Sequence, residues 1–248
     1  MDSPLFTVVV PHYQWDGKAG IKHEDFMRGM KCLQDQTFTD YEVLVIHDGP
    51  AVDTLLLSEC PFKVKCLAVR YNNWGHTSRD VGIRRANGEY IIHFNPDNIL
   101  YPNALEEIAN VINDTSLDRI MHNALIGRSC VPKRTSFYKN RGRPTAKDII
   151  IFPIWMMGVA GFGNCVVDFR AGALDIPALA KVKHLMLGYP VLPNAIDCMQ
   201  LVMKKSLWLK YGGWYDKTEN ADGVMYPRMV HEYKGGCTHI YTPLGEHF

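Results

Sequence analysis

Four apolar segments in the first hundred residues constrain the fold of this chain more than any other feature. The segments are Leu5–Val10, Tyr41–Ile46, Val64–Val69 and Tyr90–Phe94. Short apolar runs of this kind, bounded by turn residues, are typical of strands that are buried on both faces of a parallel sheet. Because helical patterns separate them, the sequence predicts an α/β fold with a doubly wound, mostly parallel sheet flanked by helices.

The helices are expected in the gaps between these strands. In the range Lys22–Gln36, apolar side chains recur at helical spacing at Phe26, Met30 and Leu33. Three more helices are expected: a short one at Asp53–Leu57, one that Thr77 or Ser78 caps and that runs to about Ala86, and one that follows Pro102 and runs to about Asn113.

Size and composition suit one large α/β domain or two small ones, with enough residues to bury a sizeable core. The chain has 248 residues, and its formal net charge of +1 argues against a dedicated polyanion binder, so no nucleic-acid partner is expected. Its 7 cysteines contain no C-x-x-C pair, which favours reduced thiols in the cytoplasm. No signal peptide is recognised, and the apolar run Ile149–Gly163 is too short for a transmembrane segment.

Polar residues follow each of the four predicted strands. They are His12 and Tyr13, then Asp48, then Asn72 with Arg79 nearby, and finally Asp97. In open α/β sheets, ligands bind beyond the carboxyl ends of the strands, so these side chains are expected to converge on one rim. Each of them alone is also explained as a turn residue. Together they predict a nucleotide pocket.

Five motifs in the first hundred residues resemble those of glycosyltransferases with the GT-A fold, of the family 2 type. In chain order they are Pro11-His12-Tyr13, Gln36-Thr37-Phe38, His47-Asp48-Gly49-Pro50, Gly75 to Gly82 with Ser78-Arg79-Asp80 at its centre, and Gly88-Glu89-Tyr90 leading into Asn95-Pro96-Asp97-Asn98. The resemblance implies one GT-A domain over residues 1–248. Residues to about 115 would bind the nucleotide-sugar, and residues from about 116 would bind the acceptor.

The resemblance also implies roles for the strand-end residues. The backbone from Pro11 through His12 to Tyr13 would line the base pocket, and Asp48 would contact the nucleobase or the ribose. Arg79 would reach the base or the diphosphate, for which guanidinium geometry is suited. Asn72 is a weaker donor-binding candidate. The competing interpretation for Arg79 is a surface cation on an arginine-rich helix.

The acidic motif of the family is reduced in this chain. Where the family has Asp-x-Asp, the sequence reads Asn95-Pro96-Asp97, which leaves one carboxylate in the expected donor and metal site. One carboxylate still holds Mg²⁺ or Mn²⁺ when phosphate oxygens and water complete the coordination. Some relatives add a late histidine as a ligand. The candidates here are His231, His239 and, preferred, His247, for which fraying of the terminal loop is the alternative.

The second half of the chain carries the expected general base. Gly212-Gly213-Trp214-Tyr215-Asp216 resembles a Gly-Gly-Phe-Asp turn of the family, in which a Glu-Asp pair follows. Asn220-Ala221-Asp222-Gly223 stands in that place, so Asp222 is the catalytic candidate, with Glu219 and Asp216 as fallbacks. The alternative for Asp222 is the N-cap of a helix at Val224–Tyr233.

Other segments of the second half have weaker signals. A strand is expected at Asp118–Leu125, a solvated loop or a closing lid at the basic stretch Arg128–Lys147, core strands or a hydrophobic acceptor groove at Ile149–Gly172, and a strand at Cys198–Lys204 followed by a short helix that Ser206 caps.

Three functions fit these patterns. The first is a metal-dependent, inverting glycosyltransferase that moves a sugar from a nucleotide-diphosphate donor to a hydroxyl of a glycan or another acceptor. UDP is the default because it is the commonest donor nucleotide of the resembling family. The second is a catalytically inactive GT-A module that binds a nucleotide or a glycan for a partner. A sugar nucleotidyltransferase ranks last, because no glycine-rich loop follows Val10.

Overall fold

In the part of the chain that the structure describes, two β-sheets form the framework. The computed structural model describes residues 3–13, 20–50, 58–114, 147–157, 183–189, 191–193, 195–233 and 237–248. The main sheet has seven strands in the order β10-β6-β9-β4-β1-β2-β3. In chain order these strands are β1 (Phe6–His12), β2 (Tyr41–His47), β3 (Val64–Cys66), β4 (Tyr90–His93), β6 (Ile149–Ile151), β9 (Leu201–Lys204) and β10 (Thr238–His239).

The predicted parallel sheet is confirmed by the four strands of the first half. β4, β1, β2 and β3 lie side by side, and all three pairs are parallel. Every residue of β1 is buried, as its apolar sequence predicts. β3 ends at Cys66, earlier than predicted, and its side chains are only partly buried because it lies at the edge of the sheet. The helix predicted at Asp53–Leu57 lies outside the described residues.

Strand β9 links the two halves of the chain in one sheet. It pairs antiparallel with β4 on one side and antiparallel with β6 on the other. Tyr90 at the start of β4 lies opposite Lys204 at the end of β9. The beginning of β9 therefore lies at the carboxyl end of β4, where the strands of the first half deliver their polar residues.

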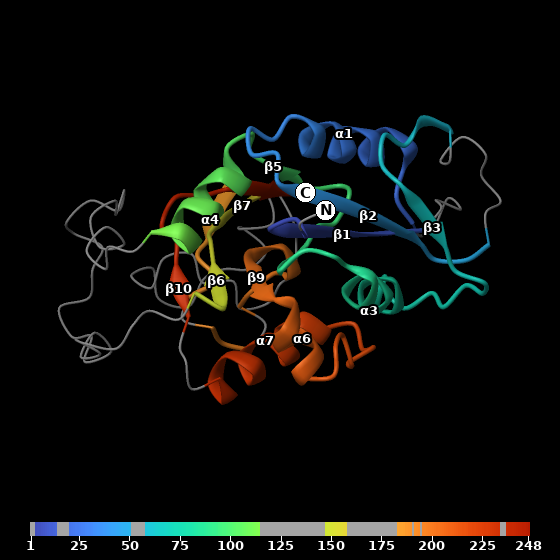
Figure 1. Ribbon diagram of the computed structural model, residues 1–248. Coiled ribbons are helices and arrows are strands. Elements are labelled where there is room, and N and C mark those ends of the chain that lie inside the picture. Colours follow the sequence, from blue (N-terminus) through green and yellow to red (C-terminus); the bar gives the residue numbers. More distant parts are fainter. Residues whose placement is uncertain are drawn as a thin grey trace.

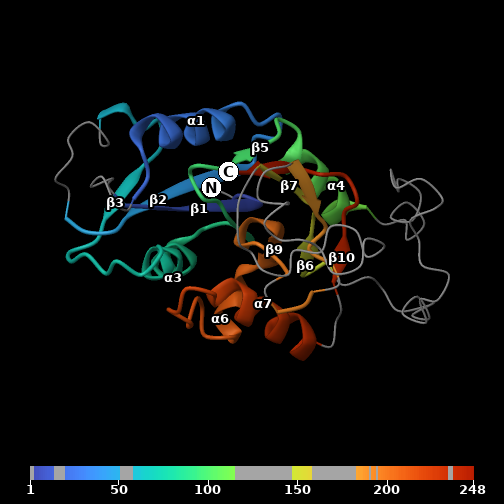
Figure 2. The same ribbon diagram turned by 180° about the vertical axis from the view of Figure 1, so that it is seen from behind.

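Helices cover both faces of the main sheet (Figures 1 and 2). α1 (His23–Gln34) and α4 (Ala104–Asn113) pack on one face, whereas α3 (His76–Arg85), α6 (Lys205–Lys210) and α7 (Ala221–Glu232) pack on the other. The apolar residues predicted for α1, Phe26, Met30 and Leu33, are fully buried in the first of these layers. A single 3₁₀ turn, η3 (Cys198–Gln200), leads into β9, so the strand predicted from Cys198 begins only at Leu201.

The helix starts differ from the predicted caps. The N-cap of α3 is Gly75 in a left-handed conformation, and the Asn73 side chain accepts the hydrogen bond from the Thr77 amide. Thr77 and Ser78 thus lie inside the helix, and the prediction that one of them caps it is wrong. Ser206 likewise lies inside α6, whose N-cap is Lys204.

The second sheet joins segments that are far apart in the sequence. Its strands are β5 (Ile99–Leu100), β7 (Ile154–Met157), β8 (Lys183–Met186) and β11 (Gly245–His247), in the order β5-β11-β7-β8. β11 pairs antiparallel with β5, with Glu246 opposite Ile99. The next residue along β11, His247, therefore comes close to the turn that precedes β5.

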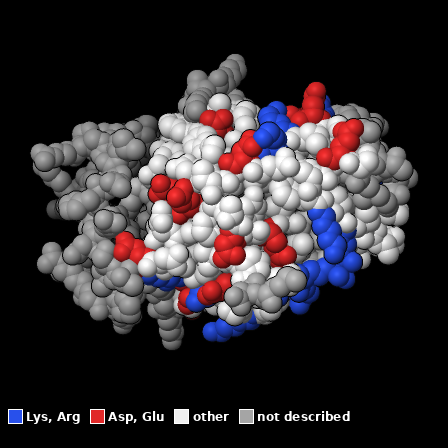
Figure 3. Space-filling model, turned by 45° about the horizontal axis from the view of Figure 1, so that its top comes forward, with Lys and Arg blue, Asp and Glu red and all other residues white. Residues whose placement is uncertain are grey.

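The surface charges, the cysteines and the helix lengths bear on the predictions made from composition. Asp and Glu are scattered over the face seen in Figure 3, and most of the Lys and Arg visible there gather toward one edge. The cysteines at the described positions are free thiols. Within the described ranges, no helix is both long and apolar enough to cross a membrane. The cytoplasmic location and the division near residue 115 stay predictions, and the segments predicted at 118–125 and 128–146 lie outside the described residues.

Candidate functional site

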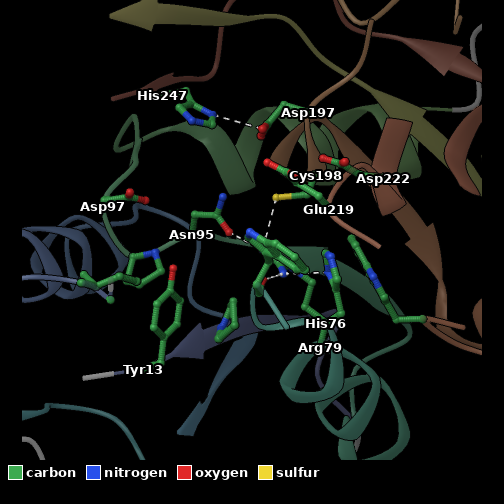
Figure 4. A pocket seen from close by; sticks show the side chains of 16 residues that line it. Tyr13, His76, Arg79, Asn95, Asp97, Asp197, Cys198, Glu219, Asp222 and His247 are labelled. Carbon is green, nitrogen blue, oxygen red and sulfur yellow. Dashed lines mark hydrogen bonds and ion pairs between the residues drawn. The ribbon is translucent and has the colours of Figure 1, made fainter. Parts of the chain in front are cut away.

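A cavity of about 230 Å³ opens beyond the carboxyl ends of β1 and β4 (Figure 4). Residues from both halves of the chain line it, as the antiparallel insertion of β9 requires. The lining residues are Pro11, Tyr13, Gly20, Ile21, Trp74, His76, Arg79, Asn95, Pro96, Asp97, Asp197, Cys198, Trp214, Glu219, Asp222 and His247. The place of the cavity in the sheet is the one that the sequence predicts for a nucleotide pocket.

One side of the cavity, which we call the strand-end wall, consists of Tyr13, Asn95 and Asp97. These residues follow β1 and β4 directly. Helix α1 approaches the turn closely, since a Cβ atom on Gly29 would lie 2.0 Å from the carbonyl oxygen of Pro96. Within the described residues, no other side chain donates a hydrogen bond to the Asp97 carboxylate, and burial raises its pKa, which nearby His247 opposes.

The opposite side, the helical wall, consists of Asp197, Cys198 and Asp222. They lie at the N-cap of η3, in η3 and in the first turn of α7. One ligand atom from each of the three lies within 4.8 Å of the others. Burial and the nearby Asp197 raise the pKa of Asp222 to about 6. Burial, followed by Asp197, also raises the pKa of the Cys198 thiol well above its usual value, so the thiol stays neutral.

Asp197, in the helical wall, forms a buried ion pair with His247. The Asp197 Oδ2 atom lies 3.1 Å from His247 Nδ1, and the side chains are only 2% and 9% exposed. Burial alone would raise the pKa of Asp197, but His247 and the Met199 amide outweigh it and lower the pKa. For His247, burial would lower the pKa, and Asp197 outweighs it and raises the pKa.

Arg79 connects the two walls through its guanidinium group. One terminal nitrogen donates to the Trp74 carbonyl at 2.6 Å, and the other donates to the Asn95 side-chain oxygen and lies 3.7 Å from Cys198 Sγ. The group also lies over the Trp214 ring, 4.9 Å from its centre. Because Arg79 is only 4% exposed, the interpretation of this residue as a surface cation is wrong.

The Gly-Gly-Trp turn sets the position of Trp214 beside the cavity. Gly212 and Gly213 have φ angles of 92° and 77°, which glycine adopts without strain. The Trp214 amide donates to the Asp80 carboxylate at 3.0 Å, and its ring stacks on His76 at 5.5 Å. Burial, followed by the charge of Arg79, lowers the pKa of His76 to about 4, so this ring is neutral at physiological pH.

Three residues predicted to bind the donor do not line the cavity. The His12 and His47 rings contact each other behind it, with their Nδ1 atoms 2.9 Å apart. Both carboxylate oxygens of Asp48 accept backbone amides, those of Tyr71 and Asn72, at 2.9 Å each. Asn72 has an exposed side chain and a φ angle of 50°. These residues shape the loop that carries Trp74.

Of the three candidate histidine ligands, the structure places only His247 at the cavity. His231 is exposed on α7, and His239 on β10 contacts Cys237, with 3.2 Å between Nε2 and Sγ. His93, on β4, is fully buried against Trp208 and Trp214.

The sequence analysis missed several residues of the site. Asp197, Cys198, Trp74 and His76 line the cavity without having been candidates. Asp197 immediately precedes a predicted strand, whereas the polar residues predicted for the pocket follow strands. In an antiparallel pair, the first residues of one strand lie beside the last residues of its neighbour, so a residue that precedes a strand can also reach the site.

The possible metal ligands in the cavity suit a hard divalent cation. Asp97 offers carboxylate oxygens without a side-chain donor from the described residues, and the ring of His247 lies near it. Mg²⁺ and Mn²⁺ prefer oxygen ligands and accept imidazole, whereas the protonated thiol of Cys198 is a poor ligand. Asp97 and His247 would thus hold the cation, as the resemblance implies.

The mostly parallel sheet with an acid-lined cavity at its carboxyl edge fits the GT-A class of fold. The family model described as "Glycosyl transferase family 2" matches residues 23–162, more than half of the chain. The chain belongs to this family. The sequence resemblance is thereby confirmed.

Individual proteins share this similarity. An uncharacterized glycosyltransferase of Rickettsia prowazekii is 24% identical over 112 residues, which cover 45% of this chain but only 33% of that protein. The crystal structure of S. aureus TarS in complex with UDP matches with a TM-score of 0.58 and 14% identity over 100% of this chain and 60% of that chain. A Pyrobaculum calidifontis mannosyltransferase in complex with GDP-Man and Mn²⁺ matches with a TM-score of 0.53 and 10% identity over 98% and 56%.

Proposed function

We propose that this protein is a metal-dependent glycosyltransferase that moves a sugar from a nucleotide-diphosphate donor to an acceptor hydroxyl with inversion. The observation that carries the proposal is the pair of carboxylates, Asp97 and Asp222, on opposite sides of one cavity (Figure 4). Single displacement needs a group that holds the leaving diphosphate on one side of the anomeric carbon and a base on the other.

The strand-end wall is the donor side in this proposal. Pro11 and Tyr13 would contact the nucleobase, while Arg79 and Asn95 would face the sugar and the diphosphate. TarS has been crystallised with UDP and with UDP-GlcNAc, and the P. calidifontis enzyme with GDP-Man, which supports a nucleotide-sugar donor. UDP remains the first donor nucleotide to test. His12, Asp48 and Asn72 would act from behind the pocket by fixing its loops.

The cation would be held by Asp97 and His247. When bound there, Mg²⁺ or Mn²⁺ neutralises the negative charge that develops on the departing diphosphate. Arg79 would add a fixed positive charge beside it, since its guanidinium is held by the Trp74 carbonyl and the Asn95 side chain. The guanidinium group of Arg79 then does not need to move during the reaction.

Asp222 would accept the proton of the acceptor hydroxyl. A carboxyl with a pKa of about 6 is ionised at neutral pH and is a stronger base than an exposed aspartate. Its position in the first turn of α7 orients it, and one of its oxygens accepts the Gly223 amide at 2.8 Å. Glu219 also lines the cavity but is exposed, which makes it the weaker base candidate.

A donor screen tests the proposal. UDP-sugars and GDP-sugars are added with and without Mn²⁺, and the melting temperature is recorded, because a ligand of the folded state raises it. We expect one donor to stabilise the protein only with Mn²⁺. Asp97→Ala should remove that gain, whereas the control Asp35→Ala, which removes an exposed partner of Lys31, should keep it.

Donor turnover then separates enzyme from inactive module. The identified donor is incubated with Mn²⁺, and release of the nucleoside diphosphate is followed with and without a panel of hydroxyl acceptors. Transfer, or slow hydrolysis without acceptor, supports the enzyme. Donor binding without either reaction would establish the inactive GT-A module instead.

A further inference from the structure

We propose that Asp197 is a positioning residue that fixes the His247 ring so that its Nε2 atom faces the cation held at Asp97. The inference rests on the proposed metal site and goes beyond it, because no sequence motif points to Asp197. Three features of the structure carry it: the strand pairing that delivers His247, the anchoring of Asp197, and the ring nitrogen at which the two side chains meet.

The pairing of β11 brings His247 to Asp97. In the antiparallel ladder, Gly245 lies opposite Leu100 and Glu246 opposite Ile99. On the other side, β11 pairs with β7, with His247 opposite Met156. His247 is therefore held in a sheet between two strands, beside the turn that carries Asp97. Backbone pairing alone, however, does not fix the rotation of the imidazole about its χ angles.

Asp197 is held rigidly on the opposite side of the ring. One carboxylate oxygen accepts the Met199 amide at 2.9 Å, and the Asp197 amide donates to Gln200 Oε1 at 2.9 Å, which completes a capping box. The Gln200 side-chain nitrogen in turn donates to the carbonyl groups of Phe152 and Met186. The position of the second oxygen, Oδ2, is thus determined by secondary structure on both sheets.

Oδ2 meets the His247 ring at Nδ1, 3.1 Å away. Because Nδ1 faces the carboxylate, the cation would lie at the other ring nitrogen, Nε2, in this proposal. Histidine ligands of metals commonly direct their other ring nitrogen at a carboxylate, which fixes the tautomer and the orientation of the ring. Such support matters here because the position of the first acid of the metal motif is Asn95, whose oxygen already accepts from Arg79.

Direct ligation of the cation by Asp197 would also place it in this cluster, and two substitutions distinguish the two roles. Asp197→Asn keeps a single side-chain oxygen, which can accept either the Met199 amide or Nδ1–H, and it is a poor cation ligand. Asp197→Ser keeps an N-cap for η3 but is too short to reach the ring. A positioning residue predicts a clear loss with Ser and a smaller one with Asn, whereas a direct ligand predicts equal losses.

The experiment measures Mn²⁺ affinity by electron paramagnetic resonance, in the presence of UDP and without turnover. We expect Asp197→Ser to weaken binding by roughly 10- to 100-fold, as removal of a carboxylate behind a metal-bound histidine does. Asp35→Ser, at an exposed position, should leave the affinity unchanged. Thermal unfolding of each variant shows whether it is folded.

A second readout needs no cation. In metal-free protein labelled with ¹⁵N-histidine, at pH 9, we expect His247 to carry its proton on Nδ1 in the wild type. Asp197→Ser should lose this preference, and His247→Gln assigns the signal. Retention of both the tautomer and the Mn²⁺ affinity in Asp197→Ser would overturn the inference.

The outcomes separate this inference from the proposed metal site. If Asp97→Ala and His247→Gln weaken Mn²⁺ binding but Asp197→Ser does not, the metal site stands and the positioning role fails. If neither Asp97→Ala nor His247→Gln affects Mn²⁺ binding, the metal site itself is wrong, and the inference fails with it.

Discussion

Both walls of the cavity carry carboxylates, but the walls differ in the secondary structure that holds these groups and in the contacts that the groups make. The strand-end wall presents one partly buried carboxylate, Asp97, on a turn between two strands, with no side-chain donor from the described residues. The helical wall presents two carboxylates, Asp197 and Asp222, close together on helical turns. One of these two is paired with His247, and the other is left with a raised pKa.

This difference indicates a division of labour. A carboxylate that has no side-chain donor among the described residues and lies on a partly exposed turn is suited to a mobile cation and its diphosphate. A carboxylate whose pKa is raised by burial and by a neighbouring acid is suited to proton transfer. Separate variants of the two walls should therefore change separate steps.

The largest effect is expected from Asp222→Asn. Loss of the base should lower kcat of sugar transfer by about 10²- to 10⁴-fold. Donor affinity, measured by calorimetry with Mn²⁺, should stay close to that of the wild type, because the strand-end wall is intact. Glu232→Gln is the matched control on the same helix, where the side chain is exposed and paired with Arg228. A variant that loses donor binding along with kcat would contradict the division between the walls.

Arg79→Lys should disconnect the walls. Lysine keeps the charge but cannot bond the Trp74 carbonyl and the Asn95 oxygen at the same time. Lost hydrogen bonds of a buried charged group should lower the free energy of unfolding by about 1.5–3 kcal/mol, measured by urea denaturation.

Arg84→Lys provides the matched control for Arg79→Lys. Arg84 lies on the same helix, is 54% exposed and pairs with Asp80. Replacement in a surface ion pair should cost less than about 1 kcal/mol. Equal losses at both positions would show that Arg79 is no more than a surface cation in energetic terms.

A smaller effect, with a defined pH range, is expected from His76→Gln in the lining of the cavity. Glutamine can still donate to the Thr218 carbonyl that His76 contacts at 2.7 Å. Burial and the charges of Arg79 and Lys217 lower the pKa of His76 to about 4, although Asp216 opposes them. The unfolded chain, with a histidine pKa near 6.5, binds the proton first, so stability falls as the pH drops from about 6.5 toward 4.

His76→Gln removes this contribution. Its free energy of unfolding should fall less steeply than that of the wild type, by about 1.4 kcal/mol per pH unit between pH 6 and pH 5. Between pH 8 and pH 7 the two proteins should show the same slope, which serves as the internal control. Identical slopes in the acidic range would mean that His76 is protonated in the folded protein.

The fold of the first half could be predicted because its information is local. Apolar strands such as Leu5–Val10 and the Phe26-Met30-Leu33 face of α1 determine their own structure. Motif order predicts Asp97, Arg79 and Asp222 as site residues, and His247 is one of three late-chain candidates; the cavity brings these four residues together.

What the sequence did not provide is long-range pairing. The antiparallel insertion of β9, which places Asp197 at the site, has no local signature. The same holds for Asp48, whose carboxylate accepts two amides of the loop between β3 and α3. Whether a strand-end acid faces a ligand or its own loop depends on the neighbouring loop, which single-sequence patterns do not describe.

The pairing of β11 with β5 has a consequence for biosynthesis. The residues that line the cavity run from position 11 to position 247, so His247 leaves the ribosome after all the others. The parallel sheet can form earlier, but a nascent chain would lack the histidine arm of the cation site. Catalytic activity is thus expected only after β11 has been synthesised. Proteolytic cleavage of the chain before Gly245 should abolish this activity while the parallel sheet stays folded.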